Sequence, residues 1–379
     1  MKQRRTVLSV SLLVLGATTL LAAAQADDGD TLPRRAWLGV ALATHANGAA
    51  VTSVVAGSTA DAAGIRPGDV ITLAGEIAVR VPQDVIVAMA RQDGGDAVAL
   101  AFIRDGVETR RQVVLRSYPR EEMPNVSFDY GSVPLDDASR LRTIVSVPAG
   151  RKGRLPAVML LQGGGCGSVD MPFAPDVGQH GLLRAVAAQG YVTMRVEKSG
   201  IGDSKGPPCD AIGYEQELTG YRAALRALQQ HPAVDPARIY LLGISLGGVF
   251  APVLARDYPV RGIVTYGTIA FAPSPYPGRS ERFFKEIATL DVPAAWAAID
   301  ARVLALHGSY DDNTTAADHA RIVAIVNAQR PGRAVHRELE GLDHCWTWHP
   351  SPAASKGNCG NGQTTTALRD EVLAFLREQ

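Results

Sequence analysis

The residues most suited to chemistry lie in a glycine-rich stretch, where Ser245 is the centre of Gly-Ile-Ser-Leu-Gly at 243–247. A G-x-S-x-G pentapeptide alone occurs often by chance, but here an apolar run precedes it and an apolar run of helical length follows it. A serine on a sharp strand-to-helix turn between glycines exposes its hydroxyl for nucleophilic attack. The alternative is a glycine turn in which the serine only caps a helix. We predict that Ser245 is a nucleophile.

A nucleophilic serine needs a histidine to accept its proton and an acid to orient that histidine. With this turn the chain order is serine, acid, histidine. Asp311 follows the predicted strand 302–307, where a loop can direct a carboxylate toward the serine. Asp312 is the rival, and the other role open to Asp311 is as a loop acid or the cap of a helix starting near residue 315. We predict that Asp311 is the acid.

The predicted base is His344, which lies in Gly-Leu-Asp-His directly after the predicted strand 334–339. Among the eight histidines, His307 precedes the acid in chain order, and His349 precedes a proline and lacks the glycine turn. Ser245, His344 and Asp311 together are the side-chain types of an acyl-transfer triad.

Acyl transfer also needs two N–H donors for the oxyanion. Leu246, directly after the serine, is expected to supply one. The second is expected from the glycine loop 162–167, which follows the apolar strand 157–161, with Gly164 and Gly165 as equal candidates. The same glycines could cradle a phosphate, but no Lys-Ser/Thr pair follows them, which excludes a P-loop.

The elements that position these residues alternate between strand and helix. Short β-branched or leucine-rich runs at 156–162, 191–196, 238–244, 262–266, 302–307 and 334–339 enclose helical patterns at 181–189, 214–231, 246–257 and 315–329, with edge strands at 126–130 and 141–147 and a closing helix at 365–378. This alternation predicts an α/β fold with a mostly parallel sheet and helices on both faces.

Residues 125–379 resemble the α/β-hydrolase superfamily through the motif 243–247, Asp311 and His344. The resemblance implies hydrolysis of an ester or amide through an acyl-enzyme, with no metal and no organic cofactor. Two positions depart from the family pattern. Lys198-Ser199 stands where arginine is frequent, and Gln162 stands where many members have histidine, which leaves the substrate class open.

Within this region we expect residues 267–300 to form a cap over the site. Phe271, Tyr276 and Trp346 are candidate walls of the substrate pocket, and the alternative is that such aromatic residues belong to the hydrophobic core.

The N-terminal third has a different pattern, in which short β-rich runs alternate with glycine turns. Trp-Leu-Gly-Val at 37–40, a strand at 50–55 and Ala-Gly-Ile-Arg-Pro-Gly-Asp at 63–69 resemble the PDZ domains of bacterial periplasmic proteases. The resemblance implies a small α+β domain that adds an extended peptide, or a protein C-terminus, to its sheet. Leu38, Gly39 and Val40 would then hold the peptide carboxylate. A domain that only packs on the enzyme is the alternative.

The first residues predict export. Basic residues precede an apolar run at 7–21, and Ala-Gln-Ala at 24–26 has the form read by signal peptidase. We therefore expect a signal peptide at 1–26 and a periplasmic or secreted protein without a stable membrane span after cleavage. Sec and twin-arginine export both remain open, and an uncleaved anchor is the alternative.

In an oxidising compartment the four cysteines are expected to form two disulfides, and four cysteines allow three pairings. Cys166 and Cys209 both fall in loops at the rim of the site, and Cys345 and Cys359 flank the loop after His344. We favour Cys166–Cys209 and Cys345–Cys359, with free buried thiols as the alternative. No pair has C-x-x-C spacing, so a metal site is not expected.

We thus expect three segments: a signal peptide at 1–26, a PDZ-like domain at 33–117 and a catalytic domain at 118–379. The 379 residues carry no net charge, which gives no support to nucleic-acid binding. The predicted function is an exported serine hydrolase that cleaves a carboxylic ester or amide, with the PDZ-like domain capturing a peptide or a partner. A serine peptidase or aminopeptidase-like hydrolase is one alternative. A non-catalytic PDZ protein that binds peptides on a hydrolase scaffold is the alternative from another class.

Overall fold

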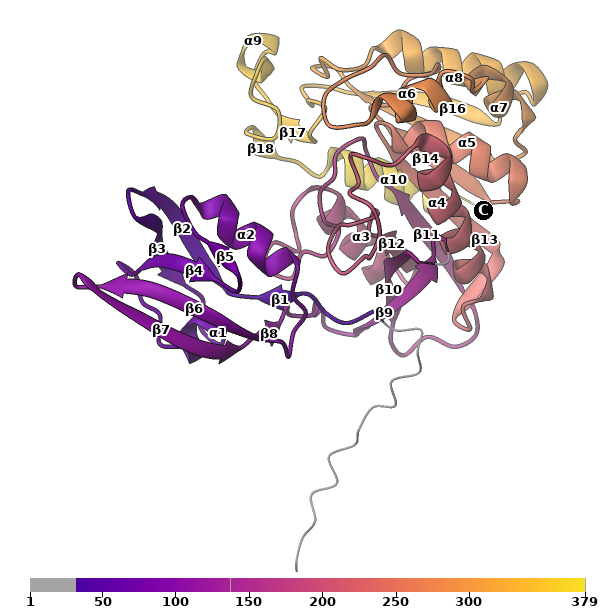
Figure 1. Ribbon diagram of the computed structural model, residues 1–379. Helices are drawn as coiled ribbons and strands as arrows, with labels where there is room; N and C mark the ends of the chain where they lie inside the picture. The colour runs from indigo at the N-terminus through magenta and orange to yellow at the C-terminus, as the bar shows by residue number, and fades with distance from the viewer. Residues whose placement is uncertain (1–31, 137, 379) are drawn as a thin grey trace, which may run out of the picture.

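The computed structural model describes residues 32–136 and 138–378, and the predicted signal peptide lies outside this range. Figure 1 shows two parts of unequal size, a small β-rich part followed by a larger part with a central sheet. No helix in the described ranges is long and apolar enough to cross a membrane.

The small part is an antiparallel sheet in the order β2-β3-β4-β6-β7, with β5 paired to β4. Helix α2 packs against it. Pro82 at its first position fixes a helical φ, and the Asp84 carboxylate accepts the N–H groups of Arg80 and Val81. The elements are β1 (Ala36–Trp37), β2 (Val40–His45), β3 (Gly48–Val54), α1 (Thr59–Ala62), β4 (Val70–Ala74), β5 (Ile77–Ala78), α2 (Pro82–Ala90), β6 (Ala97–Arg104), β7 (Val107–Val114) and β8 (Arg116–Ser117).

The larger part is an eight-stranded sheet in the order β16-β15-β14-β13-β11-β12-β10-β9. The strands from β16 to β12 are parallel, and β10 pairs antiparallel with both β12 and β9. The strands are β9 (Val126–Pro134), β10 (Arg140–Pro148), β11 (Leu155–Leu161), β12 (Val192–Val196), β13 (Val234–Ile244), β14 (Gly262–Tyr266), β15 (Arg302–Gly308) and β16 (Ala334–Leu339).

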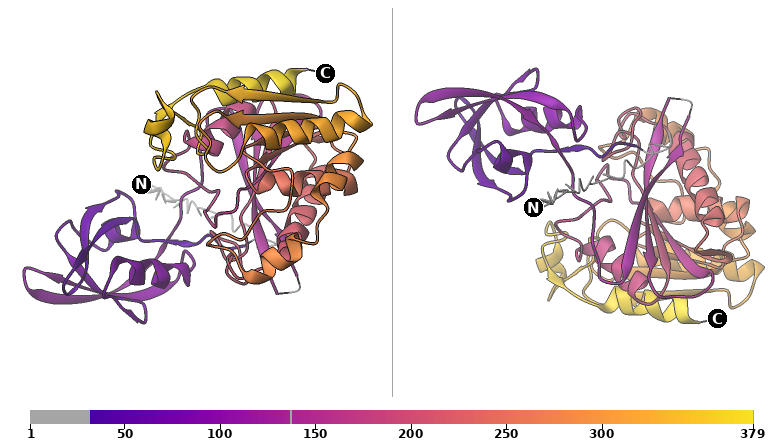
Figure 2. Two further views of the ribbon diagram at one scale, coloured as in Figure 1. Left: turned by 90° about the horizontal axis from the view of Figure 1, so that it is seen from above. Right: turned by 90° about the horizontal axis from the view of Figure 1, so that it is seen from below.

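Helices cover both faces of this sheet, as Figure 2 shows from above and below. The predicted α/β class is confirmed, and strands such as β12 and β14 are buried at every residue because both faces are covered. On one face lie α3 (Gly178–Ala188) and α10 (Ala367–Arg377). On the other lie α4 (Tyr214–Gln230), α5 (Gly247–Asp257), α6 (Glu281–Ile287), α7 (Val292–Ala298) and α8 (Ala316–Gln329).

The sequence did not predict several short elements, among them α6, α7, β17 (Thr347–Trp348), α9 (Pro352–Ser355) and β18 (Gln363–Thr364). A helix of about two turns or less, or a strand of about two residues, is too short to display its hydrophobic period. Two of them belong to the expected cap 267–300, where α6 and α7 bury Phe283 and Trp296 in the main hydrophobic cluster.

The order of the strands creates a crevice at one point of the sheet. After β11 the chain crosses one face through α3, whereas after β13 it continues through α5 on the opposite face. Because β11 and β13 are parallel neighbours, their connections diverge at the carboxyl edge. Open α/β sheets bind their ligands at such a switch point. Leu161 and Gly243, near the two strand ends, lie in register.

The two parts are joined by more than a linker, because the arm 32–35 lies against the larger part. Arg34 pairs with Asp203, forms a 2.7 Å salt bridge with Asp170 and donates to the carbonyl of Pro119 at 2.7 Å. Its side chain is 9% exposed, and the Asp203 side chain is fully buried. Arg142 of β10 also pairs with Asp203, at 2.9 Å.

Removing Arg34 tests this junction. Arg34→Ala removes the guanidinium that lies 2.7 Å from buried Asp170 and leaves Asp203 with Arg142 alone, so we expect a loss of about 3 kcal/mol in the free energy of unfolding. Urea denaturation followed by tryptophan fluorescence measures it. The control is Lys205→Ala, which removes an exposed bridge to Asp93 across the same junction and should cost less than about 1 kcal/mol. Equal losses would contradict the assigned role of the arm.

Candidate active site

Ser245 lies in a strained turn at the carboxyl end of β13. Its φ is +51°, a left-handed conformation that side chains rarely adopt, and α5 begins two residues later. The turn requires glycines on both sides. A Cβ at Gly247 would lie 2.0 Å from the carbonyl oxygen of Leu161, and one at Gly243 would lie 2.8 Å from the carbonyl oxygen of Gly247. The backbone therefore presents the Ser245 side chain at the crevice between β11 and β13.

The predicted acid and base lie together. His344 Nδ1 is 2.8 Å from Asp311 Oδ2, and the Asp311 side chain is fully buried. Burial alone raises the pKa of Asp311, but the hydrogen bond with His344 and the N–H groups of Asn313 and Thr314 outweigh it. The pKa consequently lies below its ordinary value, so Asp311 is a carboxylate that holds the imidazole with Nδ1–H toward it.

The rival residues lie elsewhere. Asp312 is exposed, and no described contact joins it to His344. The imidazole of His349 is buried and lies 2.9 Å from Asp343, a carboxylate that also accepts the N–H groups of Cys345 and Thr347. His349 and Asp343 thus stabilise the loop that carries His344.

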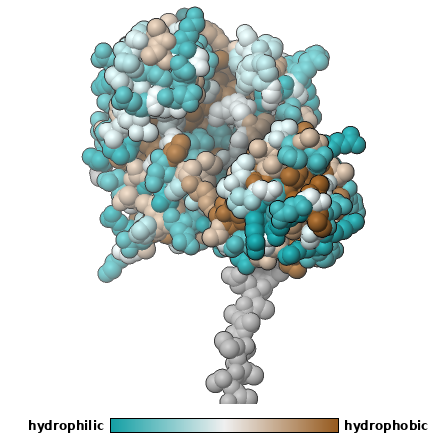
Figure 3. All heavy atoms as spheres, turned by 90° about the vertical axis from the view of Figure 1, so that its left-hand side faces the viewer, coloured by the Kyte–Doolittle hydropathy of each residue, from teal (hydrophilic) through white to brown (hydrophobic). Residues whose placement is uncertain are grey.

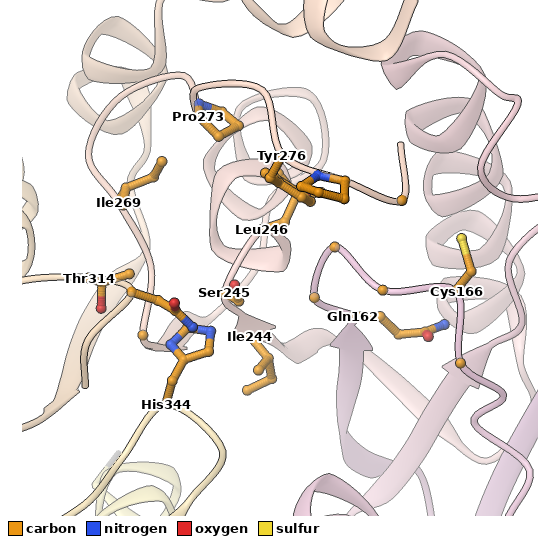
Figure 4. Close-up of a pocket in the computed structure, with 18 of the residues that line it drawn as sticks. Gln162, Cys166, Ile244, Ser245, Leu246, Ile269, Pro273, Tyr276, Thr314 and His344 are labelled. Atoms are coloured by element: carbon orange, nitrogen blue, oxygen red, sulfur yellow. The ribbon is translucent and has the colours of Figure 1, made fainter. Parts of the chain in front are cut away.

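Ser245 and His344 line one pocket, which has a volume of about 1140 Å³. Figure 4 shows both side chains at this pocket, with the loop from β11 opposite His344. Among the described residues the Ser245 hydroxyl makes no hydrogen bond. Of the two hydrogen bonds of a triad, the structure therefore shows the one between His344 and Asp311. Catalytic hydrogen bonds are often long in free enzymes and shorten when substrate binds.

Gly267, at the end of β14, was not predicted to belong to the site. A Cβ here would lie 2.8 Å from His344 Nδ1 and 2.9 Å from Asp311 Oδ2, so only glycine leaves room for their hydrogen bond. The available signal was a glycine directly after a buried strand. Thr314, which donates to Asp311 at 2.9 Å, was also missed.

The expected oxyanion donors face the same pocket. Leu246, Gly164 and Gly165 all line it, and the N–H groups of these three residues have no hydrogen-bond partner among the described residues. Free N–H groups beside a nucleophile are what an oxyanion requires. The loop is anchored at its start, where the Gln162 N–H donates to the hydroxyl of Tyr221 at 3.1 Å.

Buried polar groups lie behind this glycine loop. Lys198 Nζ donates to the Gly163 carbonyl at 2.6 Å and lies 3.1 Å from Glu217, which Arg279 also pairs with. Burial, and then the charge of Arg279, lower the pKa of the Lys198 ammonium. Both protonation states of lysine carry an N–H for the Gly163 carbonyl.

The three candidate pocket walls have different locations. Tyr276 lines the pocket, with its hydroxyl against Gly164. Phe271 is 48% exposed under the guanidinium of Arg321 and does not line the pocket. Trp346 does not line it either, because its ring packs edge to face on Tyr266, with centroids 5.8 Å apart.

Disulfides join Cys166 to Cys209 and Cys345 to Cys359, the two pairs that the sequence favoured. The first connects the glycine loop to the loop before α4, and Cys166 lines the pocket. The second closes the segment after His344. Both sides of the site are therefore covalently constrained.

A second possible binding site lies on the small part, where β2 is the edge strand of its sheet. Gly39 has φ +73°, and a Cβ there would lie 2.2 Å from Ser58 Cβ. The carbonyls of Leu38 and Gly39 accept N–H groups of Ala60 and Val55, whereas the N–H groups of Leu38 and Gly39 have no partner among the described residues. Val40, the third predicted residue of this loop, begins β2.

The sheet order, the crossing point and the turn at Ser245 define an α/β-hydrolase fold. The N-terminal resemblance is confirmed as well, since residues 36–115 match the family model of the PDZ domain. The chain thus combines a PDZ domain with an α/β-hydrolase domain.

Individual relatives agree with this assignment. Esterase EstD of Thermotoga maritima is 24% identical over 179 residues, which cover 47% of this chain and 40% of that esterase. Est1E from Butyrivibrio proteoclasticus with bound ferulic acid is 16% identical, with a TM-score of 0.51 over 65% of this chain and 98% of Est1E. A putative dipeptidyl aminopeptidase IV from Bacteroides ovatus is 14% identical, with a TM-score of 0.53 over 74% of this chain and 40% of that protein. The structural matches establish the fold.

A buried histidine beside the site makes stability depend on pH. His319 Nδ1 lies 2.8 Å from the Thr315 carbonyl, and its Nε2 accepts the Thr268 N–H at 3.2 Å. This pattern requires a neutral ring. Burial lowers the pKa of His319 to about 4, and electrostatic interactions with His307 and His336 add to this shift.

The unfolded chain binds this proton near its ordinary pKa of 6.5, so unfolding takes up a proton between about pH 6.5 and pH 4. As the pH falls through that window, protonation of His319 in the unfolded chain should lower the free energy of unfolding by roughly 2–3 kcal/mol. Urea denaturation at pH 7 and pH 4.5 measures the loss, and His319→Gln should lack this share of it. An identical pH dependence in the variant would contradict the assignment.

Proposed function

We propose that the protein is a serine hydrolase that cleaves a carboxylic ester through an acyl-enzyme. The observation that carries this proposal is the 2.8 Å contact between His344 and a buried Asp311 carboxylate in the pocket that Ser245 lines. The sequence relationship to an esterase adds support.

In the proposed reaction the Ser245 oxygen attacks the acyl carbon, and His344 Nε2 accepts the hydroxyl proton. The carbonyl electrons move onto the acyl oxygen, which the N–H group of Leu246 and one N–H of the glycine loop stabilise. His344 then returns the proton to the leaving alcohol. Water, activated by His344, releases the acid. Asp311 stabilises the imidazolium without taking its proton.

The pocket has room for a small-molecule ester. Its apolar walls include Ile244, Leu246 and Ile269, and its volume of about 1140 Å³ accommodates a small organic molecule. Within residues 32–136 and 138–378 no large gating domain covers the pocket, so we favour an ester over a peptide. Activity on aminoacyl amides rather than esters would instead indicate a peptidase.

The triad makes a direct prediction. Ser245→Ala should abolish labelling by a fluorophosphonate probe and reduce kcat/KM for p-nitrophenyl esters by roughly a thousandfold or more. Asp311→Asn should lower kcat by a similar order, because the neutral amide no longer holds the imidazole in its productive tautomer.

Asp312→Asn is the matched control, since it makes the same change at the exposed neighbouring residue. It should retain wild-type kinetics. Full activity of Ser245→Ala, or equal losses in the two aspartate variants, would refute the mechanism. Complete inactivity toward all esters and amides would favour the binding-protein alternative.

We further propose that the PDZ domain binds an extended peptide or a protein C-terminus. Support comes from the edge position of β2 and from the N–H groups of Leu38 and Gly39, which have no partner among the described residues and can donate to a carboxylate. Figure 3 shows apolar side chains among hydrophilic ones on the face that carries this domain. Ile86 of α2 is 57% exposed.

Peptides with a free C-terminus should bind to the full-length protein, and amidation should weaken binding at least about tenfold, since the carboxylate loses its charge-assisted hydrogen bonds. Fluorescence anisotropy with a panel of apolar-ended peptides measures this. A version without the PDZ domain is not used, because the arm that precedes this domain carries Arg34, which pairs with buried Asp170 and Asp203. Equal binding of free and amidated peptides would exclude a carboxylate site in this loop.

We propose that the chain acts in a periplasmic or extracellular compartment. The two disulfides support an oxidising environment, where such bonds persist. The sequence features at 1–26 provide the export signal in this proposal.

A further inference from the structure

Lys198 has no role in the triad, yet it is the buried cation nearest to the glycine loop. It follows β12 by two residues, its side chain is 1% exposed, and it does not line the pocket. Its Nζ donates to the Gly163 carbonyl at 2.6 Å. Lys198 therefore contacts the glycine loop from outside the set of residues that line the pocket.

This contact orients one peptide unit. In a trans peptide the carbonyl of one residue and the N–H of the next point in opposite directions. Because Lys198 draws the Gly163 carbonyl away from the pocket, the N–H of Gly164 is directed toward it. That N–H has no partner among the described residues.

The same geometry separates the two glycines that the sequence left as equal candidates. A Cβ at Gly164 would lie 2.1 Å from the Tyr276 hydroxyl, whereas a Cβ at Gly165 would meet nothing within 4 Å. Gly164 is thus restrained on two sides. Lys198 holds the carbonyl of the preceding residue, Gly163, and the Tyr276 ring packs against Gly164 itself. Gly165 has neither of these two contacts and is restrained only through its neighbour Cys166, which is bonded to Cys209.

The Glu217 carboxylate does not need Lys198 to balance its charge. Glu217 is paired with both Lys198 and Arg279, and all three side chains are at most 4% exposed. Arg279 alone could neutralise Glu217. Buried ion pairs contribute little net stability compared with apolar packing, so a second buried cation indicates a positional role.

We propose that Lys198 is a positioning residue of the oxyanion hole, which fixes the Gly163–Gly164 peptide so that the Gly164 N–H acts with that of Leu246. The inference rests on the proposed function. When the Ser245 oxygen bonds to the acyl carbon, the carbonyl electrons move to the acyl oxygen and the serine proton moves to His344. Lys198 exchanges no proton and touches no substrate atom.

Lys198→Met tests the proposal in the full-length protein. Without the Lys198 contact the Gly163–Gly164 peptide unit can rotate, and the Gly164 N–H then points toward the oxyanion less often. We therefore expect kcat for a p-nitrophenyl ester to fall about 10- to 100-fold, with KM changed less than about threefold. A phenylboronic acid that forms a tetrahedral adduct should bind more weakly by a similar factor. A purely structural lysine would lower the melting temperature without this selective loss of kcat.

Arg279→Met is the matched control, because it removes the other cation from the same carboxylate. Among the described residues Arg279 reaches the glycine loop only at the sulfur of Cys166, beside its disulfide partner Cys209, and not at the loop backbone. We expect kcat within about threefold of wild type. Equal losses of kcat in both variants, or an unchanged kcat in Lys198→Met, would overturn the positioning role.

A structure of the wild-type protein phosphonylated on Ser245 gives a test that does not depend on how the variants fold. The phosphonyl oxygen should lie within hydrogen-bond distance of the nitrogens of Leu246 and Gly164, with Lys198 still on the Gly163 carbonyl. An oxygen bound by Gly165 instead would overturn the proposal. If Ser245→Ala keeps wild-type activity in the same assay, the proposed function itself fails, whereas a normal Lys198→Met beside an inactive Ser245→Ala rejects only this inference.

Discussion

The close approach of two strand ends is the constraint on which the site depends. Gly247 lies so near the Leu161 carbonyl that no side chain fits between them, and Ser245 is held at φ +51°. A non-glycine residue in this region costs on the order of 1–3 kcal/mol, and it persists only where its surroundings fix it. Here the surroundings are β11 and β13, which are buried over most of their length and pair in parallel. The strained turn brings the hydroxyl beside the glycine loop that follows β11.

That loop is fixed from several directions, and one of them leads to the PDZ domain. The Cys166–Cys209 disulfide and the Lys198 hydrogen bond hold the loop to other segments of the larger part. Two residues after Cys166, the Ser168 hydroxyl bonds to buried Glu197 and accepts Arg35 Nη1 at 3.3 Å. Since Arg35 belongs to the arm that precedes the PDZ sheet, the arm and the segment directly after the glycine loop share a hydrogen-bond network. The two domains follow one another along the chain, but these hydrogen bonds couple the arm of the PDZ domain to the hydrolase domain.

Much of the site was predictable because its residues carry local signals. Ser245 lies in a pentapeptide whose glycines are required by backbone contacts within a few residues, and Asp311 and His344 follow strands that hydrophobic runs identify. Lys198 carries no such signal, and Gly267 carries only that of a glycine directly after a buried strand. Their importance comes from atoms far along the chain, the Gly163 carbonyl for one and the Asp311–His344 pair for the other. Phe271 and Trp346 show the converse, since an aromatic residue near the site in sequence can face solvent or the core.

The sequence by itself determined the two folds, because periodic burial and glycine turns are local properties that each segment carries with it. It also determined the chain order of serine, acid and histidine. Only the tertiary structure decided which neighbour of a candidate makes a contact. Asp311 rather than Asp312 lies against His344, and Lys198 contacts the carbonyl of Gly163, directly before Gly164. These choices depend on the direction of a side chain or a peptide plane. Contacts between distant segments set such directions, and spacing along one chain does not contain them.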